Sequence, residues 1–449
     1  MHTPSIKTLL DGESPVSSIL VRGWVRTRRD AKGFSFLELN DGSCLANLQC
    51  VVDEAVPGAQ RLKEILTGAA VAVQGDLVPS PAKGQRWELK ATSLELIGPA
   101  PEEYPLQKKR HSDEFLRSIA HLRPRTNKFG ALFRIRSEAS FAVHEFFRTQ
   151  GFVHVHTPIL TGSDCEGAGE LFRVTALPRD SKEGAAADFF GREAFLTVSG
   201  QLEAEPLALS LGKVYTFGPT FRAENSNTAR HAAEFWMIEP EMAFYDLKKN
   251  MDLIEDFIRF LVVNVLENCR FELEVLERDL TYLKNVLNPF ERITYDEAVK
   301  ILKGEKSVNG KNSIELLKND LEQAKQRMKD IEAEIEDKEK LVKAGGLKKG
   351  AMAFNEEKIR LLKVELKELQ ELERNIPQWL ESAANFEYGN DFGGSDETVL
   401  TRIFDVPVMV YNWPKECKAF YMKEVEDNPG LVKGVDVLAP EGYGEIVGG

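Results

Sequence analysis

Hydrophobic and polar residues alternate in short runs over residues 18–100, which is the pattern of β-strands that bury one face. The clearest run is FSFLEL at 34–39, and the turn residues Asn40, Asp41 and Gly42 follow it directly. A helical signal occurs only near 59–66. Short strands at regular spacing, with one helical segment between two of them, predict a small closed barrel of five strands over residues 1–102.

Apolar residues recur at helical spacing in several later segments. Residues 128–150 carry a broad apolar stripe that ends at Gly151, and residues 247–269 carry another. At 314–335 and 359–369 the apolar positions step by three and four, which is the spacing of a two-stranded coiled coil. Because a glycine-rich stretch separates the two, an antiparallel helical hairpin is predicted at about 311–375.

Residues 214–244 form two β-rich apolar runs joined by a polar loop, which is typical of a β-hairpin. Further β-rich runs follow the heptad segments up to the last residue. An α+β domain with an antiparallel sheet is therefore predicted over 129–449, interrupted by the helical hairpin. Residues 103–128 mix proline with basic residues and are predicted to form a hinge.

Composition and charge exclude several classes of protein. The formal net charge of the 449 residues is −13, so any RNA-binding site must be a local patch. The five cysteines are odd in number and never occur as CxxC, which argues against a disulfide framework and a zinc site. No apolar run has the length of a signal peptide or a membrane span, so a cytoplasmic protein without a membrane partner is predicted.

One face of the predicted barrel combines charge, aromatic rings and an amide: Arg26, Arg28, Arg29, Phe34, Phe36 and Gln49. A five-stranded barrel with a helix between strands is the OB pattern. The combination suits single-stranded RNA, because arginine binds the backbone, a ring stacks on a base and an amide reads a base edge. The alternative is that Phe34 and Phe36 both lie in the core, since alternation puts them on one face.

The loop of the 214–244 hairpin carries further candidate chemistry. Arg222 and Glu224 lie two residues apart, so on a strand they would point to the same face. That face would offer a guanidinium for phosphate and a carboxylate that accepts from an exocyclic amine. An ordinary ion pair explains these two residues equally well.

Longer stretches distinguish these interpretations. FRAENSNTARHAAEFWMIEPE (221–241) resembles motif 2 of class II aminoacyl-tRNA synthetases, in the form of their asparaginyl members, and GFVHVHTPIL (151–160) resembles motif 1. TGSDCEGAGELF (161–172) and TVSGQLEAE (197–205) resemble the amino-acid-binding loop and strand of that family. The resemblance covers nearly the whole chain outside the predicted helical hairpin.

The resemblance implies ATP-dependent ligation of L-asparagine to tRNA-Asn through an asparaginyl-adenylate, by a homodimer assembled through motif 1. Arg222 is the implied catalytic residue, on the α-phosphate. The other implied ATP contacts are Glu224, Phe235, Arg230, His231, Asp436 and Glu445. Asp436 and Glu445 are also the implied ligands of Mg²⁺. The implied anticodon site is the barrel face with Arg28, Phe34, Phe36 and Gln49.

The amino-acid pocket is implied by three residues. Glu166, and Gln201 from the neighbouring strand, would bind the α-amino group, and Glu239 would accept from the side-chain amide. Aspartyl-specific relatives usually carry a lysine at the position of Ala204, so its absence favours a neutral amide over aspartate.

The family pattern also raises an expectation about the C-terminal end. In the family, GEIVGG is followed by an arginine that contacts the substrate side chain and then by motif 3, and the 449 residues contain neither. The chain by itself is therefore expected to form little asparaginyl-adenylate. Two alternatives stay open: an aspartyl-tRNA synthetase, including one that also charges tRNA-Asn, and a non-catalytic RNA-binding relative.

Overall fold

The structure is a computed structural model that describes residues 3–107, 111–163, 171–225, 231–344 and 348–449. The chain divides into two compact units, which are residues 1–140 with 265–278, and residues 141–264 with 279–449.

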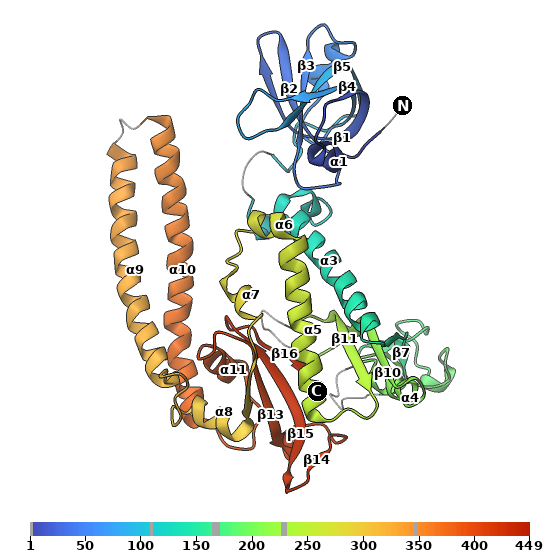
Figure 1. Ribbon diagram of the computed structural model, residues 1–449, viewed down its shortest axis with the longest axis vertical. Coiled ribbons are helices and arrows are strands. Elements are labelled where there is room, and N and C mark those ends of the chain that lie inside the picture. Colours follow the sequence, from blue (N-terminus) through green and yellow to red (C-terminus); the bar gives the residue numbers. More distant parts are fainter. Residues whose placement is uncertain (1–2, 108–110, 164–170, 226–230, 345–347) are drawn as a thin grey trace. The chain divides into compact units, whose positions relative to one another are not determined.

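The first unit contains a closed barrel of five strands in the order β1-β2-β3-β5-β4 (Figure 1). The strands are β1 (Val16–Ala31), β2 (Phe34–Asn40), β3 (Leu48–Asp53), β4 (Ala70–Pro79) and β5 (Trp87–Gly98). Only β3 and β5 pair in parallel, and the 3₁₀ helix η1 (Ala59–Glu64) connects β3 to β4. The predicted five-stranded OB barrel is confirmed.

Alternation along β2 determines which side chains fill the barrel. Ser35, Leu37 and Leu39 are buried, whereas the residues between them are half-buried on the outer face. Apolar side chains from all five strands pack with Ile6 and Leu9 of α1 (Ile6–Asp11) into one core. Burial of each large side chain contributes roughly 1.5–3 kcal/mol. The core therefore fixes the register of the strands and, with it, the residues that point outward.

Short helices surround the segment that follows the barrel: α2 (Asp113–Ser118), η2 (Arg123–Arg125), the first part of α3 (Asn127–Thr149), and α6 (Arg270–Val275). Arg26 of β1 donates to the carbonyl of Arg125 and, at 3.2 Å, to Asn127 Oδ1. These bonds tie the segment after the barrel to β1.

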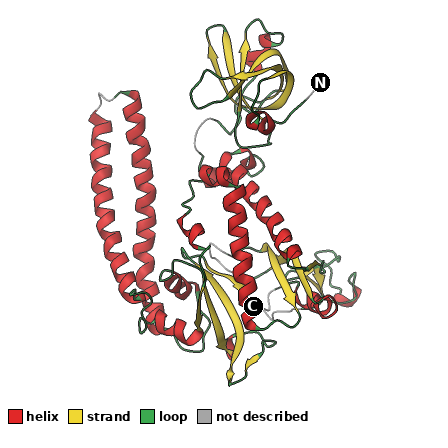
Figure 2. Cartoon of the chain, viewed as in Figure 1, coloured by secondary structure: helices red, strands yellow, loops and turns green. Residues whose placement is uncertain are grey.

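The described part of the second unit contains three sheets, with strand orders β11-β10-β6, β12-β13-β15-β14 and β7-β9-β8, and β16 adds to β15 (Figure 2). The strands are β6 (Val153–His154), β7 (Leu160–Thr161), β8 (Arg173–Val174), β9 (Ala194–Leu196), β10 (Lys213–Phe221), β11 (Glu234–Met242), β12 (Glu291–Thr294), β13 (Val408–Pro414), β14 (Glu424–Val425), β15 (Asn428–Ala439) and β16 (Gly444–Gly448). Most pairs are antiparallel, as expected, but β6 runs parallel to β10 and β12 parallel to β13.

Helix α5 (Leu247–Asn268) separates the two larger sheets (Figure 1). Asp246 caps it by accepting from the backbone N–H of Lys249 at 2.8 Å. One face, with Met251 and Ile254, packs on β13 and β15. Another, with Leu253, packs on α3 and β10. Because opposite faces of one helix are buried, the positions of both sheets depend on it.

The predicted helical hairpin corresponds to two long helices, α9 (Ser313–Ala344) and α10 (Lys349–Asn385). Asn312 caps α9 by accepting from the N–H groups of Ile314 and Glu315. Ile331, Ile335 and Leu362 are buried where the two helices meet. Helix α10 continues through Pro377, past the predicted end at 375, because Ile376 and Ala383 pack into the core beside β13.

The remaining segments of the second unit are short: η3 (Ala185–Ala187), α4 (Gln201–Leu211), α7 (Thr281–Asn285), α8 (Tyr295–Leu302), α11 (Gly394–Thr401) and η4 (Lys415–Cys417). The assignment of 197–205 to a strand is wrong, because β9 ends at Leu196 and Gln201 begins α4. Ala204 and Ala208 lie one helical turn apart and pack together against Val214 of β10, an arrangement that requires a helix.

Candidate active site

The predicted hairpin is the antiparallel pair β10–β11, and its register brings candidate residues together. Thr216 lies opposite Glu239, and Thr220 lies opposite Phe235, so these four side chains share one face. Arg222 follows the last residue of β10, and its N–H still donates to the carbonyl of Ala233 at 3.0 Å. Its guanidinium carbon lies 5.5 Å from the centre of the Phe235 ring.

The carboxylate of Glu239 is held by three donors from its own chain. The Ser199 hydroxyl donates to Oε1, the Gly200 N–H donates to both oxygens at 3.2 and 3.1 Å, and the Thr216 hydroxyl donates to Oε2 at 2.8 Å. A Cβ on Gly200 would lie 2.5 Å from Thr157 Oγ1 and 3.2 Å from Glu239 Oε2, so only glycine allows this approach. These donors make two hydrogen bonds to each oxygen, and the Gly200 N–H is shared between them, so the carboxylate is held in one orientation and acts only as an acceptor.

Gln201 at the start of α4 is also fixed at both ends of its amide. Its Nε2 donates to Glu205 Oε1 at 3.1 Å, and its Oε1 accepts from the Tyr421 hydroxyl at 3.1 Å. Because Nε2 already donates to the Glu205 carboxylate, the amide oxygen is the end of Gln201 that can accept from a further donor.

Glu241 adds a third carboxyl group beside Glu205 and Glu239. Burial, helped by the negative charges of Glu205 and Glu239, raises the pKa of Glu241 to about 8 from 4.5. An acid whose pKa rises on folding destabilises the fold above its unfolded pKa. The cost therefore grows from about pH 4.5 to about pH 8 and is absent at lower pH.

Glu241→Gln is therefore expected to stabilise the second unit at pH 9 and to have little effect at pH 4.5. After allowance for partial solvent contact, the gain at pH 9 is about 1–3 kcal/mol, or a few degrees in thermal midpoint. Melting curves of both proteins at the two pH values measure it. Equal midpoints at pH 9 would show that the Glu241 carboxyl is not destabilising.

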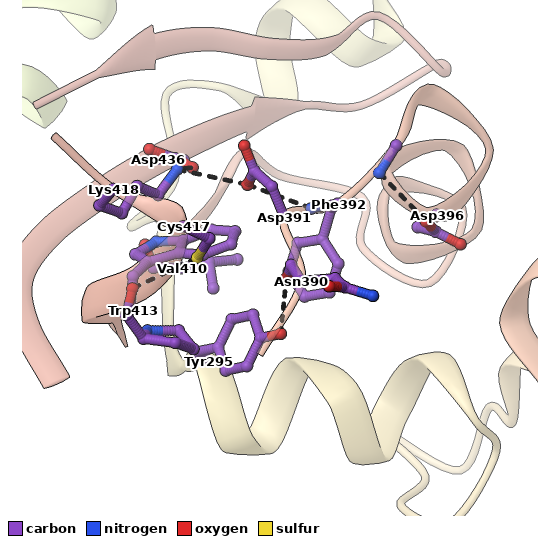
Figure 3. A network of polar contacts seen from close by, with 12 residues as sticks. Tyr295, Asn390, Asp391, Phe392, Asp396, Val410, Trp413, Cys417, Lys418 and Asp436 are labelled. Carbon is purple, nitrogen blue, oxygen red and sulfur yellow. Dashed lines mark hydrogen bonds and ion pairs between the residues drawn. The ribbon is translucent and has the colours of Figure 1, made fainter. Parts of the chain in front are cut away.

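A second group of charges, Lys418 and Asp391, lies beside Asp436 on β15 (Figure 3). Glu445 lies on β16, the strand that pairs with β15. Lys418 Nζ lies 2.6 Å from Asp436 Oδ2 and 3.4 Å from Asp391 Oδ1. Burial raises the pKa of Asp436 to about 7, although Lys418 opposes the shift. Burial also raises the pKa of Glu445, against the effects of Lys418 and Arg222. The charge of Arg222 therefore acts on Glu445 of β16.

The carboxylates of Asp436 and Glu445 fit the implied magnesium ion. Gly448 lies opposite Asp436 in the β15–β16 register. A Cβ on Gly448 would lie 2.7 Å from Glu445 Oε1 and 3.7 Å from Asp436 Oδ1, so a side chain there would fill the space beside both oxygens. No group of three potential ligands forms a metal site within the described residues. Two carboxylates suit an ion that takes its other ligands from phosphates and water.

Comparison with known proteins identifies the family. Residues 112–449 match the model for "tRNA synthetases class II (D, K and N)", and residues 19–97 match the model for an "OB-fold nucleic acid binding domain". The chain belongs to the class II tRNA synthetases.

Relatives of this synthetase carry more specific names. It is 47% identical to the asparagine–tRNA ligase of Oleidesulfovibrio alaskensis, over 100% of this chain and 84% of that protein. It is 44% identical to the ligase of the same name from Microcystis aeruginosa, with the same coverage. Its structure is similar to that of asparaginyl-tRNA synthetase from Pyrococcus horikoshii complexed with asparaginyl-adenylate, with TM-score 0.74, 29% identity, and coverage of 100% of this chain and 83% of that one.

The barrel of the synthetase presents only part of its predicted anticodon face. Phe34 and Phe36 are half-buried on the outer face, with ring centroids 5.1 Å apart, so they do not lie in the core. The guanidinium of Arg29 lies 4.5 Å from the Phe36 ring, and Gln49 shares that face. Arg28 lies opposite the buried Leu37 in the β1–β2 register, so it is not on the face of Phe34 and Phe36.

Arg28 therefore lies apart from the other predicted RNA contacts. Its guanidinium donates to the carbonyls of Leu62 and, at 3.1 Å, Ile65. These two bonds hold the segment around η1 against β1. Its predicted contact with the anticodon stays a prediction, whereas Arg29 has the position beside Phe36 that the RNA interpretation requires.

Four of the predicted ATP and amino-acid contacts are not tested by the structure. Glu166 and Arg230 lie outside the described residues. Glu224 and His231 are exposed. Their roles stay predictions.

Sequence reasoning missed the residues that hold the site together. Ser199 and Thr216 position Glu239, Glu205 holds Gln201, and Lys418 pairs with Asp436. A signal existed for Thr216, since the hairpin register puts it opposite Glu239.

None of the described helices is long and apolar enough to cross a membrane.

Proposed function

We propose that this synthetase ligates L-asparagine to tRNA-Asn in two steps, with ATP as the second substrate. The observation that carries the proposal is the held carboxylate of Glu239, an acceptor-only group whose orientation is fixed by its neighbours and which suits the N–H of a side-chain amide. Ala204 is fully buried in α4, so this position offers no cation for the carboxylate of aspartate. The 47% identity with an asparagine–tRNA ligase supports the same substrate.

In the first step, the asparagine carboxylate attacks the α-phosphorus of ATP and pyrophosphate leaves. Arg222 stabilises the charge that develops on the α-phosphate. Phe235 stacks on the adenine and Glu224 accepts from its amine, while Arg230 and His231 contact the outer phosphates. Gln201 and Glu166 bind the α-amino group. In the second step, the terminal ribose hydroxyl of tRNA attacks the adenylate, so no protein nucleophile is needed.

Asp436 and Glu445 would hold Mg²⁺, which neutralises phosphate charge when it is bound. The fit of the two carboxylates around Gly448 supports this assignment. The residues of the chain provide the remaining functions, which are to orient both substrates and to restrict the approach of water.

The same proposal covers assembly and location. Exposed apolar side chains in motif 1, Val153 and Leu160, and on the preceding helix α3, Phe141, support a homodimer formed through motif 1. The four described cysteines are free thiols, which supports a reducing cytoplasm.

The barrel face is proposed to bind the anticodon, and Phe36→Ala tests it. Loss of one stacking contact costs roughly 1–3 kcal/mol, so tRNA affinity should fall about 5- to 150-fold while adenylate formation stays unchanged. Filter binding of tRNA-Asn and pyrophosphate exchange measure the two effects. Phe115→Ala, which removes a ring from α2 of the same unit, is the control. Unchanged tRNA affinity of the Phe36 variant would contradict this anticodon face.

Pyrophosphate exchange with asparagine and with aspartate tests the function itself. In a version of the chain extended by the side-chain-reading arginine and motif 3 of the family, exchange that depends on asparagine, and is at least 100-fold weaker with aspartate, is expected. Comparable rates with both amino acids would favour an aspartyl enzyme that also serves tRNA-Asn. Binding of ATP and tRNA without exchange would favour the non-catalytic relative.

A further inference from the structure

The ammonium group of Lys418 lies beside Asp436, one of the two carboxylates that the proposed function assigns to the metal. Its Nζ lies 2.6 Å from Asp436 Oδ2, and its side chain is only 11% exposed. The second carboxylate within reach belongs to Asp391, which is 59% exposed and 3.4 Å away. The dominant partner of Lys418 is therefore the buried Asp436 rather than the solvated Asp391.

The two oxygens of Asp436 face different neighbours. Oδ2 accepts from Lys418, whereas Oδ1 lies 3.7 Å from the Cβ position of Gly448, beside Glu445 Oε1. An ion between Asp436 and Glu445 would therefore use Oδ1. As long as Oδ2 stays with Lys418, Asp436 can offer one oxygen and not both.

An aromatic platform fixes Lys418 in this position. Nζ lies 3.9 Å from the centre of the Trp413 ring, so the ammonium group sits between an aromatic face and a carboxylate (Figure 3). Trp413 is 1% exposed, packs against Tyr295 and Phe392, and donates from Nε1 to the Val410 carbonyl. The ammonium is therefore held by a rigid part of the core and not by a free surface loop.

The net charge of Lys418, Asp436 and Glu445 determines how strongly a divalent cation binds between the two carboxylates. Asp436 and Glu445 together carry two negative charges when ionised, and Lys418 cancels one of them beside the buried carboxylate of Asp436. Repulsion between the ammonium and a divalent ion a few ångströms away is strong at low local polarity. The phosphates of ATP would supply the missing negative charge.

We infer that Lys418 is an internal counter-ion that keeps Asp436 and Glu445 from binding a divalent cation until the phosphates of ATP are present. This inference rests on the proposed function, because it takes the metal site from it. It makes loading of the metal dependent on the nucleotide, so that the ion enters together with its substrate. Lys418 thus acts as a positioning residue for Asp436 and as an electrostatic barrier.

Binding of Mn²⁺ to the nucleotide-free protein, followed by the EPR signal of the free ion, tests the inference. Lys418→Met keeps the aliphatic chain and removes the charge, so it should bind Mn²⁺ at least tenfold more tightly than the wild type. Lys418→Arg keeps the charge and should bind as weakly as the wild type. Lys415→Met is the matched control, because Lys415 pairs with Glu424 at the surface. Equal or weaker binding by Lys418→Met would overturn the inference.

Two further variants keep the outcome interpretable. If the unpaired Asp436 prevents folding of Lys418→Met, Lys418→Gln retains a neutral donor for Oδ2, and it should show the same gain in Mn²⁺ affinity. Adding Asp436→Asn to the lysine variant should abolish that gain. A gain that persists would place the ion elsewhere and overturn the metal assignment of the proposed function as well. A site that needs Asp436 but ignores Lys418 would overturn the inference alone.

Discussion

In a version of the chain extended by motif 3, Arg222→Ala is expected to lower asparagine-dependent pyrophosphate exchange by about 10²–10³, because one lost contact to transition-state charge costs about 3–4 kcal/mol. Arg222 directly follows β10, beside Phe235, and its field reaches Glu445. Arg222→Lys keeps the charge but loses the planar fork, so it should retain part of the rate.

The loss should appear in the rate and not in the fold. The Arg222 backbone keeps its bond to Ala233, so the hairpin and the melting temperature should change little. Arg259→Ala removes a surface arginine of α5 in the same unit and should leave exchange unchanged. Exchange within a fewfold of the wild type for Arg222→Ala would contradict the assignment of this residue to the α-phosphate.

The parts of the fold that follow one local period were predictable from the sequence. Alternation in FSFLEL gave the strand β2 and the face shared by Phe34 and Phe36, because a period of two leaves few choices of register. The heptads gave α9 and α10 for the same reason. Whether Phe34 and Phe36 point inward or outward depended on what the other strands supply to the core.

The parts that depend on distant partners were not predictable. Gln201 begins a helix because Ala204 and Ala208 pack on Val214, a contact that no pattern within 197–205 reveals. The parallel pairs β6–β10 and β12–β13 join strands far apart in the chain. Lys418 contacts Asp436 only because β15 pairs with β13, the strand that carries Trp413, in the folded sheet. The functional residues were named by resemblance, whereas the residues that support them required the structure.

Glu239→Gln is expected to lower kcat/KM for asparagine by about 10³–10⁴, because a site built to hydrogen-bond a polar substrate group loses most of its discrimination when one partner is changed. A carboxylate only accepts, which matches the donors from Ser199, Gly200 and Thr216. The amide of glutamine has a donating end, and that end must face one of these donors or the substrate amide. Both arrangements leave polar groups without partners in a half-buried site, at about 1–3 kcal/mol for each.

Aspartate should not become the better substrate of this variant. Removal of the Glu239 charge relieves repulsion toward a second carboxylate, but Ala204 still provides no cation to bind it. The kinetics of exchange with each amino acid, compared with Glu291→Gln at the exposed start of β12, measure the change. A tenfold or smaller loss with asparagine would show that Glu239 serves only to join α4 to the hairpin. Efficient exchange with aspartate would show that charge at residue 239, and not the missing lysine at 204, sets the choice between the two amino acids.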